Sequence, residues 1–169
     1  MLTRNDYEHG TFTILTSEVD PDDFREDYED FIAFCEEYNI EQNDDNFYEW
    51  CADIIEENYR CDMENIKECD AYNVPVLVTG VLGLWWGESK ISPMQFHSVY
   101  DAIRSCIECS DADKVCVEFI NGVIVAKCAH HDGTNVFTIR ALSKKGINRV
   151  STNFKEYDFK RLPYLYNIY

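Results

Sequence analysis

No apolar run in the sequence is long enough to cross a membrane. The longest, at residues 74–86, contains Pro75, Gly80 and Gly83 and falls short of the roughly 20 residues that a spanning helix needs. The N-terminal residues MLTRND have neither the basic start nor the apolar stretch of a secretion signal. We therefore expect the protein to be made in the cytoplasm and to stay there.

Sequence motifs of the common enzyme classes are also missing. The chain contains no Walker loop, G-x-S-x-G elbow, H-E-x-x-H helix or dinucleotide-binding glycine motif. The best candidate for a catalytic or metal-binding site is the group His130, His131 and Asp132, because His and Asp side chains on loops often bind metals or act as acid–base catalysts. The alternative is a structural turn, in which Asp132 and Gly133 form the turn and one histidine faces inward. We favour the turn and expect no enzyme activity, with a small metal-dependent or acid–base enzyme as the alternative function.

Disulfides are not expected, although the chain has eight cysteines. In a reducing cytoplasm, most free cysteines are small buried hydrophobic residues. A zinc site is the alternative, because Cys106 and Cys109 have the C-x-x-C spacing. The residues that would complete its tetrahedron are Cys116, Cys128, His130 or His131. No second pair with zinc-ligand spacing follows, so we expect neither a metal nor any other cofactor.

Positive charge is scarce in the first 73 residues. They hold 23 Asp and Glu against four Lys and Arg, a net charge of −19, whereas residues 74–169 hold nine against eleven. Such an acidic surface repels phosphate groups, so we expect no direct binding of DNA or RNA and predict a basic protein surface as the partner. The last 30 residues carry a small basic excess, which is predicted either to pack on the acidic half or to contact a partner.

The composition predicts one folded α+β domain over residues 1–169. Hydrophobic residues make up 46% of the chain and aromatic residues 14%, too many for a disordered protein despite a net charge of −17. Helical spacing of apolar residues predicts two acidic helices, one from Asp20 to Tyr38 with Asn39 as its stop, and one from Asn43 to about Cys69. The apolar stripe of the first helix is Phe24, Tyr28, Phe31, Cys35 and Tyr38.

The second half, residues 74–169, begins with a predicted strand. Residues 74–86 are rich in β-branched side chains and suit a buried central strand with a bend or bulge at Gly80 or Gly83. For Trp85 and Trp86 at its end, we expect packing in the core, and the alternative is a pair of apolar anchors for a partner.

A helix and a meander are predicted after that strand. Ser92 and Gln95 form a capping box, and apolar residues at helical spacing continue to Ile107. Alternating patterns then predict a three-stranded antiparallel meander whose first hairpin turns at Asn121 and Gly122. Its strands are expected at residues 115–120, 123–129 and 136–142.

Four pieces of sequence between Asn46 and Gly146 are distinctive. They are FYEWCADI, LVTGVLGLWWG followed by I-x-P, the Asn-Gly hairpin, and HHDGTNVFTIRALSKKG. Together they resemble a family of small proteins encoded by phages and mobile elements of Gram-positive bacteria, over about three-fifths of the chain. That family is largely uncharacterised, so the resemblance implies a mobile-element setting inside a bacterial cell and no mechanism. In charge and size, the chain is also similar to phage anti-CRISPR and anti-restriction proteins that mimic DNA.

The spacing of the acids is close to that of phosphates on DNA. Eight acidic residues lie between Asp22 and Tyr38, which is about one charge per 3 Å at a rise of about 1.5 Å per residue, against roughly 3.4 Å per phosphate on one DNA strand. The alternative is the solvated face of an ordinary amphipathic helix.

We therefore predict that the protein inhibits a nucleic-acid-handling enzyme of bacterial defence, first a CRISPR nuclease and second a restriction enzyme. A non-inhibitory accessory protein of phage replication is the further alternative. The predicted partner-binding residues are Asp22, Asp23, Glu26, Asp27, Glu29, Asp30, Glu36, Glu37, Glu49, Asp53, Glu56, Glu57, Trp85 and Trp86.

Overall fold

The computed structural model describes residues 12–14, 17–19 and 28–160. The chain falls into two compact units, one formed by Met1–Glu56 with Tyr164–Tyr169 and the other by Glu57–Pro163. The boundary lies inside one long helix, α3 (Asp44–Glu68), whereas the charge changes near residue 73. The fold is α+β, as the sequence predicts. The single-domain prediction stays a prediction.

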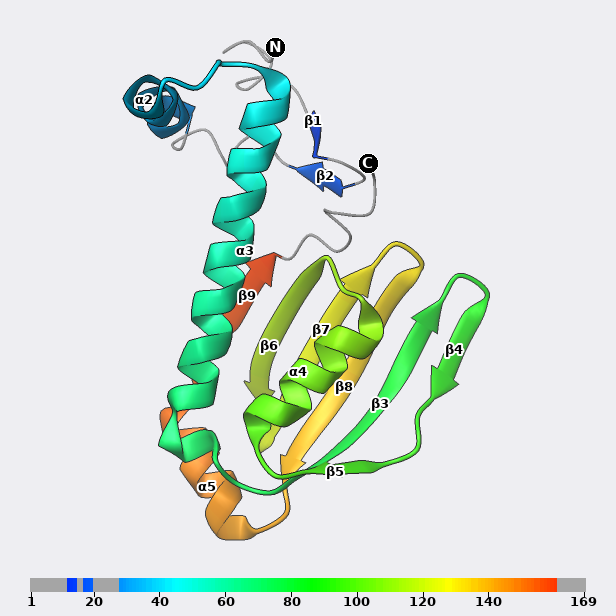
Figure 1. The fold of residues 1–169 in the computed structure, drawn as a ribbon. Helices are drawn as coiled ribbons and strands as arrows, with labels where there is room; N and C mark the ends of the chain where they lie inside the picture. Colours follow the sequence, from blue (N-terminus) through cyan, green and yellow to red (C-terminus); the bar gives the residue numbers. More distant parts are fainter. Residues whose placement is uncertain (1–11, 15–16, 20–27, 161–169) are drawn as a thin grey trace. The chain divides into compact units, whose positions relative to one another are not determined.

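The first unit contains a short hairpin and two helices. Strands β1 (Phe12–Ile14) and β2 (Ser17–Val19) pair antiparallel, and the sequence patterns did not predict them. Helix α2 (Tyr28–Tyr38) and the first part of α3 follow (Figure 1). The predicted helix start at Asp20 lies outside the described residues.

The connection between α2 and α3 is fixed by two asparagines. Asn39 has a left-handed backbone with φ of 52°. The N–H of Ile40 donates to the carbonyl of Cys35 at 2.9 Å, as in the motif that commonly ends helices. The side-chain oxygen of Asn43 then accepts from the N–H of Asn46 at 2.9 Å and caps α3. Both predicted helix boundaries around this connection are confirmed.

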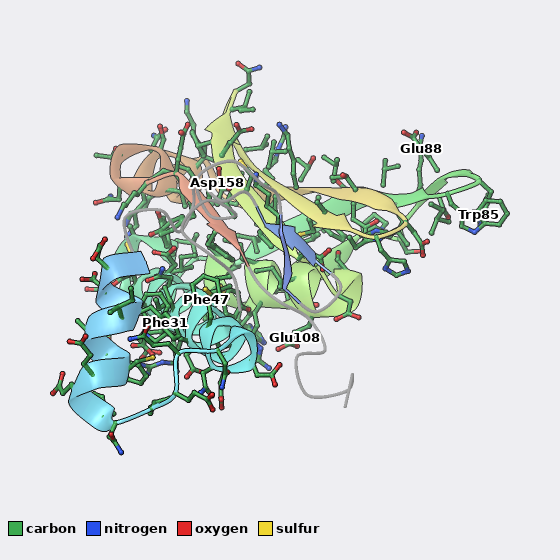
Figure 2. The ribbon with its side chains drawn as sticks, turned by 90° about the horizontal axis from the view of Figure 1, so that it is seen from above. Phe31, Phe47, Trp85, Glu88, Glu108 and Asp158 are labelled. Carbon is green, nitrogen blue, oxygen red and sulfur yellow. The ribbon has the colours of Figure 1, made fainter. Side chains whose placement is uncertain are left out.

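Aromatic packing joins α2 to α3. Phe31 is only 1% exposed, and its ring lies 5.2 Å from the ring of Phe47 (Figure 2). The ring of Trp50 lies 5.6 Å from it. Cys35, one turn further along α2, is also buried. The predicted place of Tyr38 in this stripe is wrong, because Tyr38 is 60% exposed and packs on Phe34 at 4.9 Å. It is the last residue of α2, next to the left-handed turn at Asn39.

The second unit is built on a seven-stranded antiparallel sheet. Along the sheet, the order is β4 (Gly87–Lys90), β3 (Val76–Leu84), β8 (Gly133–Ala141), β7 (Val123–His130), β6 (Lys114–Ile120) and β9 (Tyr157–Lys160), and β5 (Met94–Phe96) pairs with β3. Helix α4 (Val99–Ser110) lies across one face of the sheet (Figure 1). The remaining elements are the 3-10 turn η2 (Asp70–Tyr72) and helix α5 (Lys144–Asn153).

The core of this unit lies between α4 and the sheet. Alternate strand residues are buried under the helix, while their neighbours on the opposite face are half-buried or exposed. Examples of the buried set are Val76, Val78, Val115, Val117, Phe137 and Ile139 on the strands and Val99, Ile103 and Ile107 on α4. The predicted meander is confirmed, with Asn121 (φ 51°) and Gly122 (φ 84°) at its first turn.

The predicted start of α4 is wrong. The helix begins at Val99, and its cap is Ser98, whose hydroxyl accepts from the N–H of Asp101 at 3.1 Å. Residues Met94–Phe96 instead form β5, because they gain ladder hydrogen bonds by pairing with Val76–Val78 of β3. The Ser92 capping box therefore precedes a strand.

The basic C-terminal part contains elements that the sequence patterns did not predict. Ser143 caps α5 by accepting from the N–H of Gly146 at 3.0 Å. Strand β9 follows and buries Tyr157 and Phe159 in the core of the second unit. Lys144, Lys145 and Arg149 of α5 are exposed.

Over the described ranges, no helix combines the length and the apolar character that crossing a bilayer requires.

Candidate functional site

Every described carboxylate that the sequence predicts to bind a partner is exposed. These residues are Glu29, Asp30, Glu36 and Glu37 of α2, and Glu49, Asp53, Glu56 and Glu57 of α3. Four further predicted residues, Asp22, Asp23, Glu26 and Asp27, lie outside the described part of the chain. Exposure is the first requirement for a binding role, and the eight described acids meet it.

Helical geometry gathers these acids on the faces opposite the core. On α2, Glu29 and Glu36 are seven residues apart and so lie on one side, away from buried Phe31 and Cys35. On α3, three of the predicted partner-binding acids are spaced four and three residues apart and form one row. That row consists of Glu49, Asp53 and Glu56. We call these two surfaces the acidic faces of α2 and α3.

Most of the acidic faces carry no compensating cation. Among the residues that the structure describes, five of these acids form no ion pair: Glu36, Glu37, Glu49, Asp53 and Glu56. The repulsion between acids three or four residues apart costs each helix a few tenths of a kcal/mol per pair, as for Glu49 with Asp53. Folding therefore does not explain why these positions are acidic.

Glu57 differs from the other acids. It belongs to the second unit, where its carboxylate accepts from Arg60 Nη2 at 2.6 Å and from Nε at 3.1 Å. The hydrogen bonds from Arg60 lower the pKa of Glu57. Its charge is thus partly neutralised within α3, so we expect it to contribute less to a partner than Glu49, Asp53 or Glu56.

The match to the phosphate spacing of DNA is looser in the described residues than in the whole predicted helix. Along α2, no acid lies between Asp30 and Glu36. Along α3, Glu49 and Glu56 are seven residues apart with Asp53 between them, which gives about one charge per 5 Å of helix axis. Four of the eight acids that give the spacing of about 3 Å lie at residues 22–27, outside the described part.

Trp85 and Trp86 form the tip of the β3–β4 hairpin. Leu84 pairs with Gly87, so these two tryptophans are the whole loop. Trp85 is 80% exposed and Trp86 63%, so the expectation that they pack in the core is wrong. The reason is that both lie beyond the last paired residues, as Figure 2 shows for Trp85 at the outer end of the hairpin. Two large exposed rings at one turn are suited to anchoring a partner.

The His130–Asp132 group lies at the β7–β8 turn. His130 pairs with Gly133, so the loop residues are His131 and Asp132, one position earlier than predicted. His130 is half-buried and the side chain of His131 is 84% exposed, which confirms that one histidine faces inward. His131 Nε2 lies 3.0 Å from Asp132 Oδ2. The structure thus brings all three candidate side chains together.

Behind this turn lies a buried asparagine that the sequence patterns missed. Asn135 is 4% exposed, and its Nδ2 donates to the hydroxyl of Ser110 at 2.9 Å. Its Oδ1 accepts from the N–H of Gly83 at 2.9 Å and lies 3.2 Å from His130 Nε2. The available signal was a polar residue at an inward position of the alternating pattern that continues with Phe137 and Ile139.

The structure does not gather the cysteines into the group of ligands that the alternative zinc site needs. None of the eight, all of which lie in the described part, is in a disulfide, and four are buried. Among the described residues, the group of three or more close metal-binding side chains is His130, His131 and Asp132, which contains no cysteine. Burial raises the pKa of Cys106, and it raises the pKa of Cys128 to about 12, so both thiols stay protonated at neutral pH.

Comparison with known proteins gives no assignment. No protein-family model matches the chain, and neither a curated protein nor a solved structure matches it. The resemblance to the phage and mobile-element family stays a prediction.

Proposed function

We propose that this chain is an anti-defence protein of a phage or mobile element that binds and inhibits a nucleic-acid-handling enzyme. The first candidate is a CRISPR nuclease and the second a restriction enzyme. The observation that carries the proposal is a set of five exposed carboxylates that form no ion pair within the described ranges, namely Glu36 and Glu37 of α2 and Glu49, Asp53 and Glu56 of α3. Repulsion between such charges lowers helix stability. Lys and Arg of a basic partner would relieve this repulsion and would form charge-assisted hydrogen bonds with the carboxylates, which favours binding.

Inhibition would work by occlusion. A nucleic-acid-binding groove is lined with Lys and Arg, which make charge-assisted hydrogen bonds to phosphates. Carboxylates on a rigid helix can accept the same bonds, so Glu49, Asp53 and Glu56 would occupy cations that otherwise hold DNA or guide RNA. The net charge of −19 over residues 1–73 would also speed association with such a groove.

The tryptophans of the second unit offer a separate contribution. Interfaces take most of their energy from a few large side chains that become desolvated, and Trp is the most enriched of these. Trp85 and Trp86 are exposed in the free chain and are held on a two-residue loop, so little backbone conformational entropy would be lost on docking. Charge would then set the rate of association, and the aromatic pair would slow dissociation.

A cleavage assay tests this proposal. The purified full-length chain is titrated against an RNA-guided DNA nuclease and a restriction enzyme, at low and at high salt, before and after each enzyme is loaded with nucleic acid. We expect inhibition of one of them at low salt, weaker inhibition at high salt, and no band shift of free DNA by the chain alone. Full activity of both enzymes, or inhibition that depends on the chain binding DNA, would contradict the proposal.

A further inference from the structure

Asn135 determines which nitrogen of His130 carries the proton. The backbone N–H of Gly83 can only donate, so the Asn135 atom that lies 2.9 Å from it is the carbonyl oxygen. The same oxygen lies 3.2 Å from His130 Nε2, which must therefore be the protonated nitrogen. A neutral imidazole has one N–H, so Nδ1 keeps its lone pair. The N–H of Asp132, 3.2 Å from Nδ1, agrees with this assignment because it needs an acceptor there.

This arrangement is the one that metal-binding histidines use. A ligating imidazole almost always donates its other N–H to a carbonyl or carboxylate, which fixes the ring and the tautomer. Here the carbonyl belongs to a side chain that is itself held by Gly83 and Ser110. The lone pair of His130 Nδ1 thus points toward the turn. The hydrogen bond that it accepts from the N–H of Asp132 is long, at 3.2 Å.

Two further donor side chains lie near His130. One ligand atom from each of His130, His131 and Asp132 lies within 4.8 Å of the other two. Ligand atoms about 2.0–2.2 Å from a tetrahedral metal are roughly 3.3 Å apart, so the exposed side chains of His131 and Asp132 need only small rotations. Their side chains are 84% and 42% exposed, which gives an ion free access.

We propose that the β7–β8 turn binds a divalent first-row transition-metal ion, Zn²⁺ in the cell, through His130 Nδ1, His131 and Asp132. Two imidazoles and a carboxylate suit Zn²⁺ better than Ca²⁺ or Mg²⁺, which take all-oxygen sites. Three protein ligands leave one position open, which water or a side chain of a bound protein can take. Asn135 is a positioning residue, because it acts through His130. The site lies in the second unit and does not depend on the acidic faces or on the proposed inhibition.

Cobalt titration of the metal-free, full-length protein tests the site. We expect one Co²⁺ per chain, with visible d–d absorption and without the intense near-ultraviolet band of thiolate ligands, and displacement of Co²⁺ by Zn²⁺. His131→Ala and Asp132→Asn should each weaken Co²⁺ binding at least tenfold. His130→Gln, which keeps a donor for Asn135, should do the same. His97→Ala, which removes an exposed histidine outside the turn, should leave binding unchanged.

Three results would overturn the proposal. The first is no Co²⁺ binding at millimolar concentration. The second is binding that His131→Ala and Asp132→Asn leave unchanged while both variants keep the wild-type circular dichroism spectrum. The third is a thiolate band that disappears when the exposed Cys61 and Cys109 are changed to Ser, which would assign the ion to the cysteines.

Discussion

The side-chain carbonyl of Asn135 accepts a hydrogen bond of 2.9 Å from the backbone N–H of Gly83, beyond the point where β3 and β8 stop pairing residue by residue. The two strands approach so closely here that a Cβ on Gly83 would lie 2.3 Å from the carbonyl oxygen of Thr134. Only glycine fits at this position. The asparagine replaces a missing ladder bond, and it also holds Ser110 and His130.

Replacing this asparagine should destabilise the second unit. Asn135→Ala leaves the N–H of Gly83 and the hydroxyl of Ser110 without their partner, and each buried polar group left unsatisfied costs about 1–3 kcal/mol. We expect the free energy of unfolding to fall by about 2–4 kcal/mol in urea denaturation. Thr134→Ala, at the exposed neighbouring position, is the control and should change little. Equal stability of the two variants would show that the network contributes nothing.

The thiols should divide into reactive and protected sets. An aromatic disulfide reagent reacts with the thiolate and must reach the sulfur atom. At pH 8 it should therefore label the exposed Cys61 and Cys109 first. The four buried cysteines should react only after unfolding; they are Cys35, Cys51, Cys106 and Cys128. Peptide mapping of the labelled chain checks the order. Rapid labelling of Cys128 in the native protein would contradict its burial.

A dependence of stability on alkaline pH follows from the same burial. Burial raises the pKa of Cys128 from 9.0 to about 12, so the folded state holds this proton more tightly than the unfolded chain does. The resulting stabilisation is complete below pH 9 and is lost as the pH rises from 9 to 12. In urea denaturation over that range, Cys128→Ala should show a weaker decline than the wild-type protein. An identical decline in both would rule out Cys128 as a cause.

The exposed tryptophans should matter for binding and not for folding. Because Trp85 and Trp86 make up a solvent-exposed loop, changing both to Ser should alter the free energy of unfolding by less than about 0.5 kcal/mol. If they anchor the inhibited enzyme, its affinity should fall by at least about 2 kcal/mol, which is roughly 30-fold. Leu142→Ser, at another exposed apolar residue of the same unit, is the matched control. Unchanged affinity by calorimetry would remove the pair from the interface.

Local patterns predicted those parts of the fold in which local and tertiary preferences agree. The hairpin at Asn121 and Gly122 needed two residues with positive φ between alternating strands, and both signals are in the sequence. The cap at Asn43 likewise fixed the start of α3. The start of α4 could not be predicted in this way, because residues 94–96 become a strand only when β3 is present to pair with them.

In the candidate sites too, local sequence predicts some features, whereas others depend on tertiary structure. Exposure of the acids on α2 and α3 follows from helical periodicity, so the sequence predicted it. The exposure of Trp85 depends on where pairing between β3 and β4 ends, and apolar composition alone pointed to the core. Asn135 is an inward-facing polar residue whose partners Gly83 and Ser110 are distant in the sequence, so only the folded sheet reveals its role.

The acidic face of α3 can be tested by charge removal at constant shape. The variant Glu49→Gln, Asp53→Asn and Glu56→Gln removes three exposed charges that the described chain leaves unpaired. Relief of like-charge repulsion should keep its stability equal to that of the wild-type protein or slightly higher. A control variant with Glu88→Gln, Glu156→Gln and Asp158→Asn removes the same charge from exposed positions of the second unit.

The affinity of these two variants for the inhibited enzyme is the most direct test of the proposed function. Close interfacial charge pairs couple by about 1.5 kcal/mol or more each, so the α3 variant should bind at least about 100-fold more weakly, with slower association. The control variant should bind nearly as well as the wild-type protein, and raising the salt concentration should reduce the difference between them. If both variants bind like the wild-type protein, or lose affinity equally, the acidic face of α3 does not replace nucleic acid and the account is wrong.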